Sequence, residues 1–187
     1  MSAGRTVVVY AGSAPMRGET SYSQAEKLGR ALARAGFVVA SGGYIGAMEA
    51  VSRGAAEAGG RVIGVTCDQI ERWREVKPNR WLHDEIRCQT IPERIKRLVE
   101  IGDAIVVLPG GLGTLSEVAL TWALLHIREI EPKPFLLVGE EWRQILDAFV
   151  RHAQGYVRGK DIELLTFVPD QASAVRVLVE QFAAVEG

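Results

Sequence analysis

The chain has 187 residues, of which 48% are hydrophobic and 24% charged, with a formal net charge of −1. This composition is typical of one globular domain and argues against extensive disorder. The charge gives no footprint for nucleic acid, and no apolar run of about 18 residues predicts a membrane span. The N-terminus lacks the basic-then-apolar plan of a signal peptide, so we expect a cytoplasmic protein, folded as a single domain over residues 1–187, with no nucleic acid or membrane as partner.

The first third of the chain alternates apolar runs with helical periodicities. Strands are predicted at residues 6–11, 37–40 and 61–66, and amphipathic helices between them at 22–35 and 47–58. Such alternation indicates parallel strands joined by right-handed crossover helices.

Small residues follow the first two predicted strands. The first strand ends in Gly12-Ser13-Ala14-Pro15, where Ser13 offers a hydroxyl group and a backbone donor to a ligand, although loop formation alone also explains these residues. The second strand leads into Ser-Gly-Gly-Tyr-Ile-Gly at residues 41–46, another glycine-rich turn. We favour ligand contact for the loop at residues 12–15.

Residues 67–84 contain two tryptophans, several charges and no sustained period. Two interpretations stay open for this segment: a flap over an active site, or a surface connection with tryptophans tucked onto the body. A strand at 86–90 and a helix at 92–102 follow, with Pro92 suited to the first turn of the helix.

The predicted helix at 92–102 begins with three cations, Arg94, Lys96 and Arg97. Positive charge is unfavourable in a first helical turn because of the helix dipole. An anionic ligand or a carboxylate partner would compensate it. We therefore expect a functional role for Arg94 and treat Lys96 and Arg97 as solvated.

An apolar run at residues 104–108 predicts a buried parallel strand, which Pro109-Gly110-Gly111 stops in a glycine-rich turn. A helix is predicted to start at Gly113 or Thr114, with Thr114 as N-cap and Glu117 completing a capping box. Glycines let the backbone approach a ligand, and the free N–H groups of the first turn attract an anion. The pattern predicts a phosphate site; the alternative is a capping box that binds nothing.

The rest of the chain continues the same alternation. The helix that starts near residue 113 has an apolar stripe and ends near His126, strands are predicted at 134–138 and 164–168, and helices at 142–153 and 171–184. The complete pattern predicts an α/β fold, a Rossmann-like doubly wound and mostly parallel sheet with helices on both faces.

No metal or cofactor is expected. Cys67 and Cys88 have no ligand spacing and are interpreted as small buried hydrophobes, and the three histidines form no metal motif. The patterns G-x-G-x-x-G after the first strand and G-x-x-x-x-G-K-[ST] do not occur, which argues against a nicotinamide dehydrogenase and a P-loop kinase.

The motifs resemble those of the Lonely Guy family, whose members are often mislabelled as possible lysine decarboxylases. Residues 109–117 match the family pattern P-G-G-x-G-T-x-x-E in full, and similar stretches extend from residues 11–13 to 120–123. The upstream M-H-x-R-K of the family is replaced by Ile-Pro-Glu-Arg-Ile at residues 91–95, which keeps only the arginine.

The resemblance implies a hydrolase that cleaves the N-glycosidic bond of a nucleoside 5′-monophosphate, either a cytokinin nucleotide or adenylate. It implies Arg94 and Glu117 as the catalytic pair, Glu75 as a base-contacting acid, a small-molecule nucleotide as partner, and a homodimer or higher homo-oligomer. The phosphate and ribose ligands that it implies are Ser13, Gly42, Gly43, Gly110, Gly111, Leu112, Gly113 and Thr114.

The chemistry of the residues agrees with this implication. Cleavage builds oxocarbenium character on the ribose, which a carboxylate at Glu117 can stabilise, and an adjacent guanidinium at Arg94 favours the charged carboxylate. The alternative is a non-catalytic nucleotide-binding or molybdenum-cofactor carrier protein of the same fold. A carrier would not need a paired arginine and carboxylate, and retention of both favours the enzyme.

Overall fold

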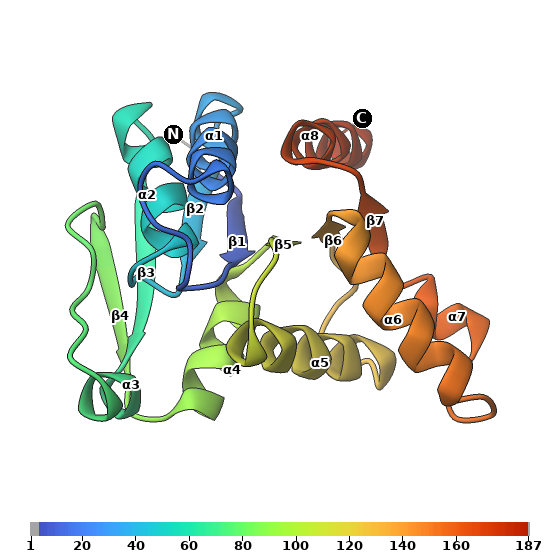
Figure 1. Cartoon of the computed structure of the whole chain (residues 1–187). Helices are drawn as coiled ribbons and strands as arrows, with labels where there is room; N and C mark the ends of the chain where they lie inside the picture. Colours follow the sequence, from blue (N-terminus) through green and yellow to red (C-terminus); the bar gives the residue numbers. More distant parts are fainter. Residues whose placement is uncertain (1–3, 187) are drawn as a thin grey trace.

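The computed structural model describes residues 4–186, whose strands form one seven-stranded sheet in the order β4-β3-β2-β1-β5-β6-β7 (Figure 1). All six strand pairings are parallel. The strands are β1 (Thr6–Tyr10), β2 (Val38–Ser41), β3 (Val62–Cys67), β4 (Asp84–Cys88), β5 (Ala104–Val107), β6 (Phe135–Val138) and β7 (Thr166–Val168). The helices are α1 (Thr20–Arg34), α2 (Ala47–Glu57), α3 (Asp68–Trp73), α4 (Ile91–Ile101), α5 (Leu112–His126), α6 (Glu140–His152), α7 (Gly159–Ile162) and α8 (Gln171–Glu186).

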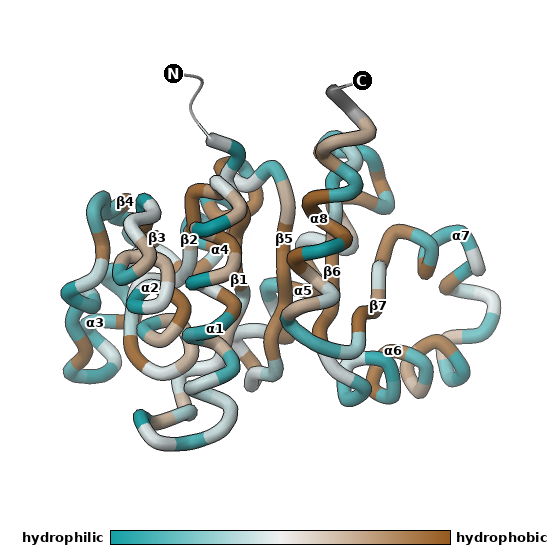
Figure 2. The backbone as a smooth tube through the Cα atoms, turned by 90° about the horizontal axis from the view of Figure 1, so that it is seen from above, coloured by the Kyte–Doolittle hydropathy of each residue, from teal (hydrophilic) through white to brown (hydrophobic). Residues whose placement is uncertain are grey.

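Each face of the sheet has its own apolar core. Alternate residues of β1 divide between the two cores: Val7 and Val9 pack with α1, α2 and α8, whereas Val8 and Tyr10 pack with α4, α5 and α6. Figure 1 shows these two helix layers on opposite sides of the sheet. In Figure 2 the hydrophobic colour follows the central strands, and hydrophilic residues lie on the outer helices. The predicted Rossmann-like α/β fold is confirmed.

Helices α1 and α2 approach each other closely at two glycines. A Cβ atom on Gly29 would lie 2.0 Å from the carbonyl oxygen of Val51, and one on Gly54 would lie 1.9 Å from that of Glu26. Only a residue without a side chain fits at either position, so the two helices pack backbone against backbone.

The strand order reverses between β1 and β5. The chain runs from β1 outward to β4 and then returns to the other side of β1 with β5. The loops that follow β1 and β5 therefore diverge and leave a crevice, which is where open α/β sheets bind ligands. The two loops also approach each other closely, since a Cβ atom on Gly12 would lie 3.2 Å from the Cα atom of Gly110.

The two cysteines are buried, as predicted. Cys67 and Cys88 are free thiols that occupy paired positions on β3 and β4, with 0% and 3% of their surface exposed. Burial raises the pKa of the Cys88 thiol.

Two short helices, α3 and α7, were not predicted. Helix α3 lies within the irregular segment and has no buried residue, so its sequence carries no apolar period to detect. No helix among residues 4–186 combines the length and the hydropathy needed to cross a bilayer.

The predicted capping box of α5 is wrong. The helix begins at Leu112 with Gly111 as its N-cap, and no side chain caps it. Thr114 lies inside the first turn and is 3% exposed. A capping box is present at the start of α4 instead, where Thr90 and Glu93 each bind the backbone of the other.

Candidate active site at the β1–β5 crevice

A cavity of about 310 Å³ lies at the carboxyl ends of β1 and β5. Four other elements contribute to its walls: the start of α2, the end of α3, the first turn of α4 and the first two turns of α5. Its lining residues are Ala11, Gly12, Ser13, Tyr44, Met48, Ile70, Trp73, Arg74, Ile91, Arg94, Ile95, Gly111, Leu112, Gly113, Thr114, Ser116 and Glu117.

Arg94 enters the cavity from the first turn of α4 and is held by protein acceptors. Its Nε donates to the carbonyl oxygen of Val65 at 2.7 Å, and its Nη2 donates to that of Gly42 at 3.1 Å. Its Nη1 lies 3.5 Å from Oε1 of Glu117. The positive charge at the start of α4 is thus compensated by a carboxylate, one of the two solutions that the sequence allowed.

Glu117 lies in the second turn of α5 and is 6% exposed. Burial raises the pKa of its carboxyl group to about 7, and the Arg94 guanidinium opposes part of this rise. Burial therefore outweighs the ion pair, whereas the sequence-based expectation was that Arg94 keeps the carboxylate ionised. A carboxyl group that titrates near neutral pH is suited to proton transfer under physiological conditions.

Tyr44 contacts Arg94 of this pair and was not predicted from the sequence. Its ring centroid lies 5.7 Å from Cζ of Arg94, a cation–π contact that restrains the guanidinium. The backbone N–H of Cys67 donates to the Tyr44 hydroxyl at 2.7 Å. Burial is the main reason that the pKa of Tyr44 rises to about 12, so the phenol stays neutral. Its position directly after Gly42-Gly43 was the available signal.

The turn between β5 and α5 supplies the opposite wall. The N–H of Leu115 makes the first bond along the helix, to Gly111, so the N–H groups of Leu112, Gly113 and Thr114 precede the helical ladder. Gly110 lies behind this turn, because a Cβ atom there would be 2.1 Å from Oγ1 of Thr114. The free N–H groups and the helix dipole favour an anion at this wall.

Four of the expected ligands do not line the cavity. One of them is Gly110, which lies behind the turn. The carbonyl oxygen of Gly42 accepts a hydrogen bond from Arg94, and Gly43, at φ +76°, packs against Gly64 of β3. Glu75 is exposed and outside the lining, whereas the preceding Arg74 is part of it. The structure brings together Ser13, Arg94, Glu117 and residues 111–114.

The irregular segment borders the site. Ile70, Trp73 and Arg74 belong to α3 and its end, and all three line the cavity. The segment therefore lies beside the site, and Trp73 is 78% exposed and not tucked onto the body. Within residues 4–186, no three His, Cys, Asp or Glu side chains are grouped so that they can bind a metal ion.

The fold and the site define a class of protein: a Rossmann-like α/β protein with a buried arginine–glutamate pair beside a glycine-rich helix N-terminus at the switch point of its sheet. The family model described as "possible lysine decarboxylase" matches residues 48–178. The chain belongs to this family, the Lonely Guy family.

Curated relatives agree with this family assignment, and a solved structure agrees with the fold. The chain is 32% identical over 160 residues to the cytokinin riboside 5′-monophosphate phosphoribohydrolase of Rhodococcoides fascians, covering 82% of this chain and 78% of the relative. It is 32% identical over 179 residues to the protein of the same name from Mycobacterium tuberculosis, covering 91% of each. The molybdenum cofactor binding protein of Rippkaea orientalis has the same fold, with a TM-score of 0.73 at 22% identity over 97% of this chain and 99% of that one.

Proposed function

We propose that the protein hydrolyses the N-glycosidic bond of a purine-type nucleoside 5′-monophosphate, a cytokinin or adenosine nucleotide, to free base and ribose 5-phosphate. One observation carries the proposal: the buried Arg94–Glu117 pair shares a cavity with the anion-attracting first turn of α5. The relatives from Rhodococcoides fascians and Mycobacterium tuberculosis, both named as cytokinin riboside 5′-monophosphate phosphoribohydrolases, support it.

The arrangement of α5 suits a phosphorylated ribose. A phosphate on the N–H groups of residues 112–114 places the attached sugar over the following turn, where Glu117 faces the cavity. When the C1′–N bond breaks, its electron pair leaves with the base and the ribose becomes oxocarbenium-like. Water then adds to C1′ and one of its protons passes to the Glu117 carboxylate. The departing base takes up a proton from solvent, and Glu117 releases its proton to solvent, which restores the carboxylate.

Arg94 acts on the carboxylate in this mechanism. Its guanidinium lowers the pKa of Glu117 relative to burial alone, which keeps a larger fraction of the carboxyl group ionised at neutral pH. The two backbone carbonyls of Val65 and Gly42 fix its orientation. A preorganised charge of this kind stabilises the transition state without further reorganisation.

The test is base release measured by chromatography from adenylate and from an isopentenyladenine nucleotide. The wild-type protein is expected to release base. Glu117→Gln is expected to do so at least about 100-fold more slowly, because it lacks the negative charge that stabilises the oxocarbenium-like transition state. Calorimetry is expected to show nucleotide binding retained in Glu117→Gln. Binding without release by the wild type would favour the carrier alternative, and equal turnover by both would remove Glu117 from the mechanism.

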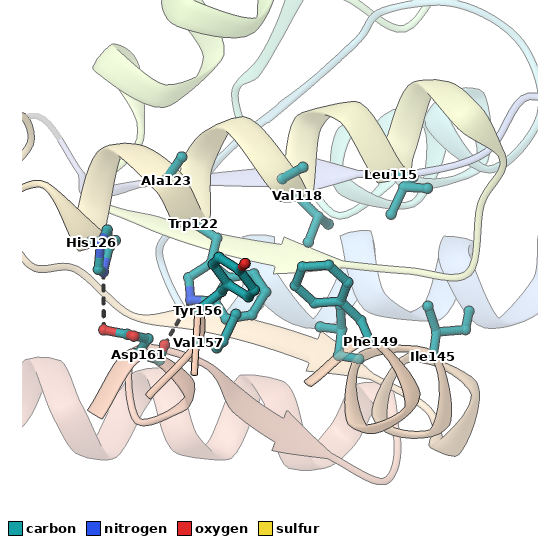
Figure 3. A pocket seen from close by; sticks show the side chains of 12 residues that line it. Leu115, Val118, Trp122, Ala123, His126, Ile145, Phe149, Tyr156, Val157 and Asp161 are labelled. Atoms are coloured by element: carbon teal, nitrogen blue, oxygen red, sulfur yellow. Dashed lines mark hydrogen bonds and ion pairs between the residues drawn. The ribbon is translucent and has the colours of Figure 1, made fainter. Parts of the chain in front are cut away.

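We further propose that the protein is a homodimer that buries the groove between α5 and α6 (Figure 3). We call this surface the α5–α6 groove; its lining residues are Leu115, Val118, Ala119, Trp122, Ala123, His126, Ile145, Leu146, Phe149, Tyr156, Val157 and Asp161. Phe149 is 52% exposed and Tyr156 is 90% exposed. Contiguous exposed apolar surface of this kind favours association.

A further inference from the structure

Two arginines line the cavity, and the protein neutralises only one of them. Arg94 has Glu117 as counterion and two backbone acceptors. Arg74 has no carboxylate within ion-pair distance among residues 4–186. Its Nε is buried without a hydrogen-bond partner there, and its Nη1 lies 3.4 Å from Oγ of Ser13. Arg74 is therefore the arginine of the cavity with charge and donors to offer a ligand.

The position of Arg74 relates it to the anion-attracting turn. Ser13, which contacts its guanidinium, follows Gly12, and Gly12 touches Gly110 at the base of the β5–α5 turn. Arg74, Ser13 and residues 111–114 line the same cavity, so an anion held at the first turn of α5 lies in the cavity that Arg74 also lines. The ring of Trp73 lies 5.6 Å from Cζ of Arg74 and restrains the guanidinium from the solvent side.

The charges of the cavity favour a phosphate monoester. The Arg94–Glu117 pair has no net charge when both groups are ionised, and the N-terminus of α5 contributes about half a positive charge. Arg74 adds a full positive charge, and no carboxylate of the part of the chain that the structure describes forms an ion pair with it. Guanidinium groups bind phosphate oxygens through charge-assisted hydrogen bonds, commonly two at once.

We propose that Arg74 binds the 5′-phosphate of the substrate and makes the site select phosphorylated nucleotides over free nucleosides. The identity of the substrate rests on the proposed hydrolase function, whereas binding of a sugar phosphate by Arg74 does not depend on turnover. In this proposal Arg94 pairs with the Glu117 carboxylate, and Arg74 binds the phosphate group of the substrate.

The test compares Arg74→Gln with Arg74→Lys, which keeps the charge, and with the control Arg72→Gln. Arg72 is exposed on the same helix and does not line the cavity. Calorimetry with ribose 5-phosphate is expected to show affinity about 10- to 100-fold weaker in Arg74→Gln, since charge-assisted hydrogen bonds are lost, and unchanged in Arg72→Gln. Arg74→Lys is expected to be intermediate. The KM for adenylate should rise in Arg74→Gln with little change in kcat, whereas inhibition by adenosine should not change.

Four outcomes separate this proposal from the hydrolase. Loss of ribose 5-phosphate binding in Arg74→Gln alone supports the role of Arg74 even if the wild type releases no base. Base release together with unchanged binding by Arg74→Gln overturns the role of Arg74 and leaves the hydrolase standing. Absence of ribose 5-phosphate binding by the wild type overturns the role as well. Equal loss of adenosine and ribose 5-phosphate binding would assign Arg74 a structural role and overturn phosphate selection.

Discussion

Glu117 is the residue at which the two electrostatic effects of the site compete. Burial favours the neutral acid, the guanidinium of Arg94 favours the carboxylate, and the balance sets the pKa at about 7. The 3.5 Å separation explains why the guanidinium does not prevail, because a tight charge-assisted hydrogen bond is shorter than 3 Å. The pKa of the carboxyl group therefore lies near neutral pH, where the group can both accept and return a proton.

The competition predicts a specific pH dependence. If the carboxylate is the active form, kcat/KM for base release rises as the pH increases through about 7. Arg94→Gln removes the effect that lowers the pKa of Glu117, so the rise is expected to move to higher pH, together with a lower rate. The measurement is a pH–rate profile of both proteins from about pH 5 to about pH 9.

The substrate provides an internal control for this profile. The phosphate ionises near pH 6, but its ionisation is the same for both proteins, so the displacement between their curves reports on Glu117. Curves that coincide, or a displacement to lower pH, would contradict the proposed interaction of Arg94 with the carboxylate.

The sequence indicated both residues of the Arg94–Glu117 ion pair, but not every residue that lines the cavity around them. The P-G-G-x-G-T-x-x-E stretch pointed to Glu117, and the cationic start of a helix pointed to Arg94. Glu75 was expected from the resemblance to contact the base, but it is exposed and outside the cavity lining, whereas the preceding Arg74 is part of it. The irregular segment offers no period that fixes which side chain faces inward. A shift of one residue in extended backbone is enough to exchange an exposed side chain for a cavity-lining one.

At the scale of elements, the apolar periods located the long helices and the buried strands, because burial of one face leaves a pattern in the sequence. Helix α3 buries none of its residues and therefore left no such pattern. The start of α5 was misplaced for a different reason. A threonine followed three residues later by a glutamate is typical of a capping box, but here Thr114 and Glu117 are two buried residues inside the helix.

The packing of α1 against α2 predicts an inverted response to a common stabilising substitution. Glycine to alanine within a helix normally stabilises it by up to about 1 kcal/mol. At Gly54 the new Cβ atom would lie 1.9 Å from the Glu26 carbonyl oxygen, so Gly54→Ala is expected to lower the free energy of unfolding by about 1–3 kcal/mol. Urea denaturation measures the change.

The matched control is Gly159→Ala at the start of α7. No atom lies within 4 Å of a Cβ at that position, so the free energy of unfolding should stay the same or rise slightly. A Gly54→Ala protein as stable as this control would show that α1 and α2 separate without cost.

At the scale of the whole molecule, alternation of strands and helices predicted a parallel sheet but not the strand order. The order β4-β3-β2-β1-β5-β6-β7 determines that the loops after β1 and β5 diverge, and thus where the cavity lies. Residues from the ends of β1 and β5 and from α2, α3, α4 and α5 meet there although they are far apart in the chain. Motifs identify such residues singly, and only the topology brings them into one site.

At the same scale, the exposed α5–α6 groove leads to a prediction about the oligomeric state. Phe149 packs edge-on against Trp122 with ring centroids 6.2 Å apart, yet remains half exposed. A charged side chain at this position would have to be desolvated on association, so Phe149→Lys is expected to convert a dimer into a monomer without unfolding the chain. Light scattering after size-exclusion chromatography measures the mass directly.

Val179 of α8 provides the control for this substitution. It is 45% exposed, and α8 packs with α1 on the opposite face of the sheet from the α5–α6 groove. Val179→Lys adds the same charge to a comparably exposed apolar position, so it should leave the mass at twice that of one chain. A wild-type protein that is monomeric at micromolar concentration, or equal dissociation of both variants, would show that the groove does not hold the subunits together. The apolar lining of the groove favours the opposite result, because exposed side chains of this kind gain free energy when a partner removes them from water.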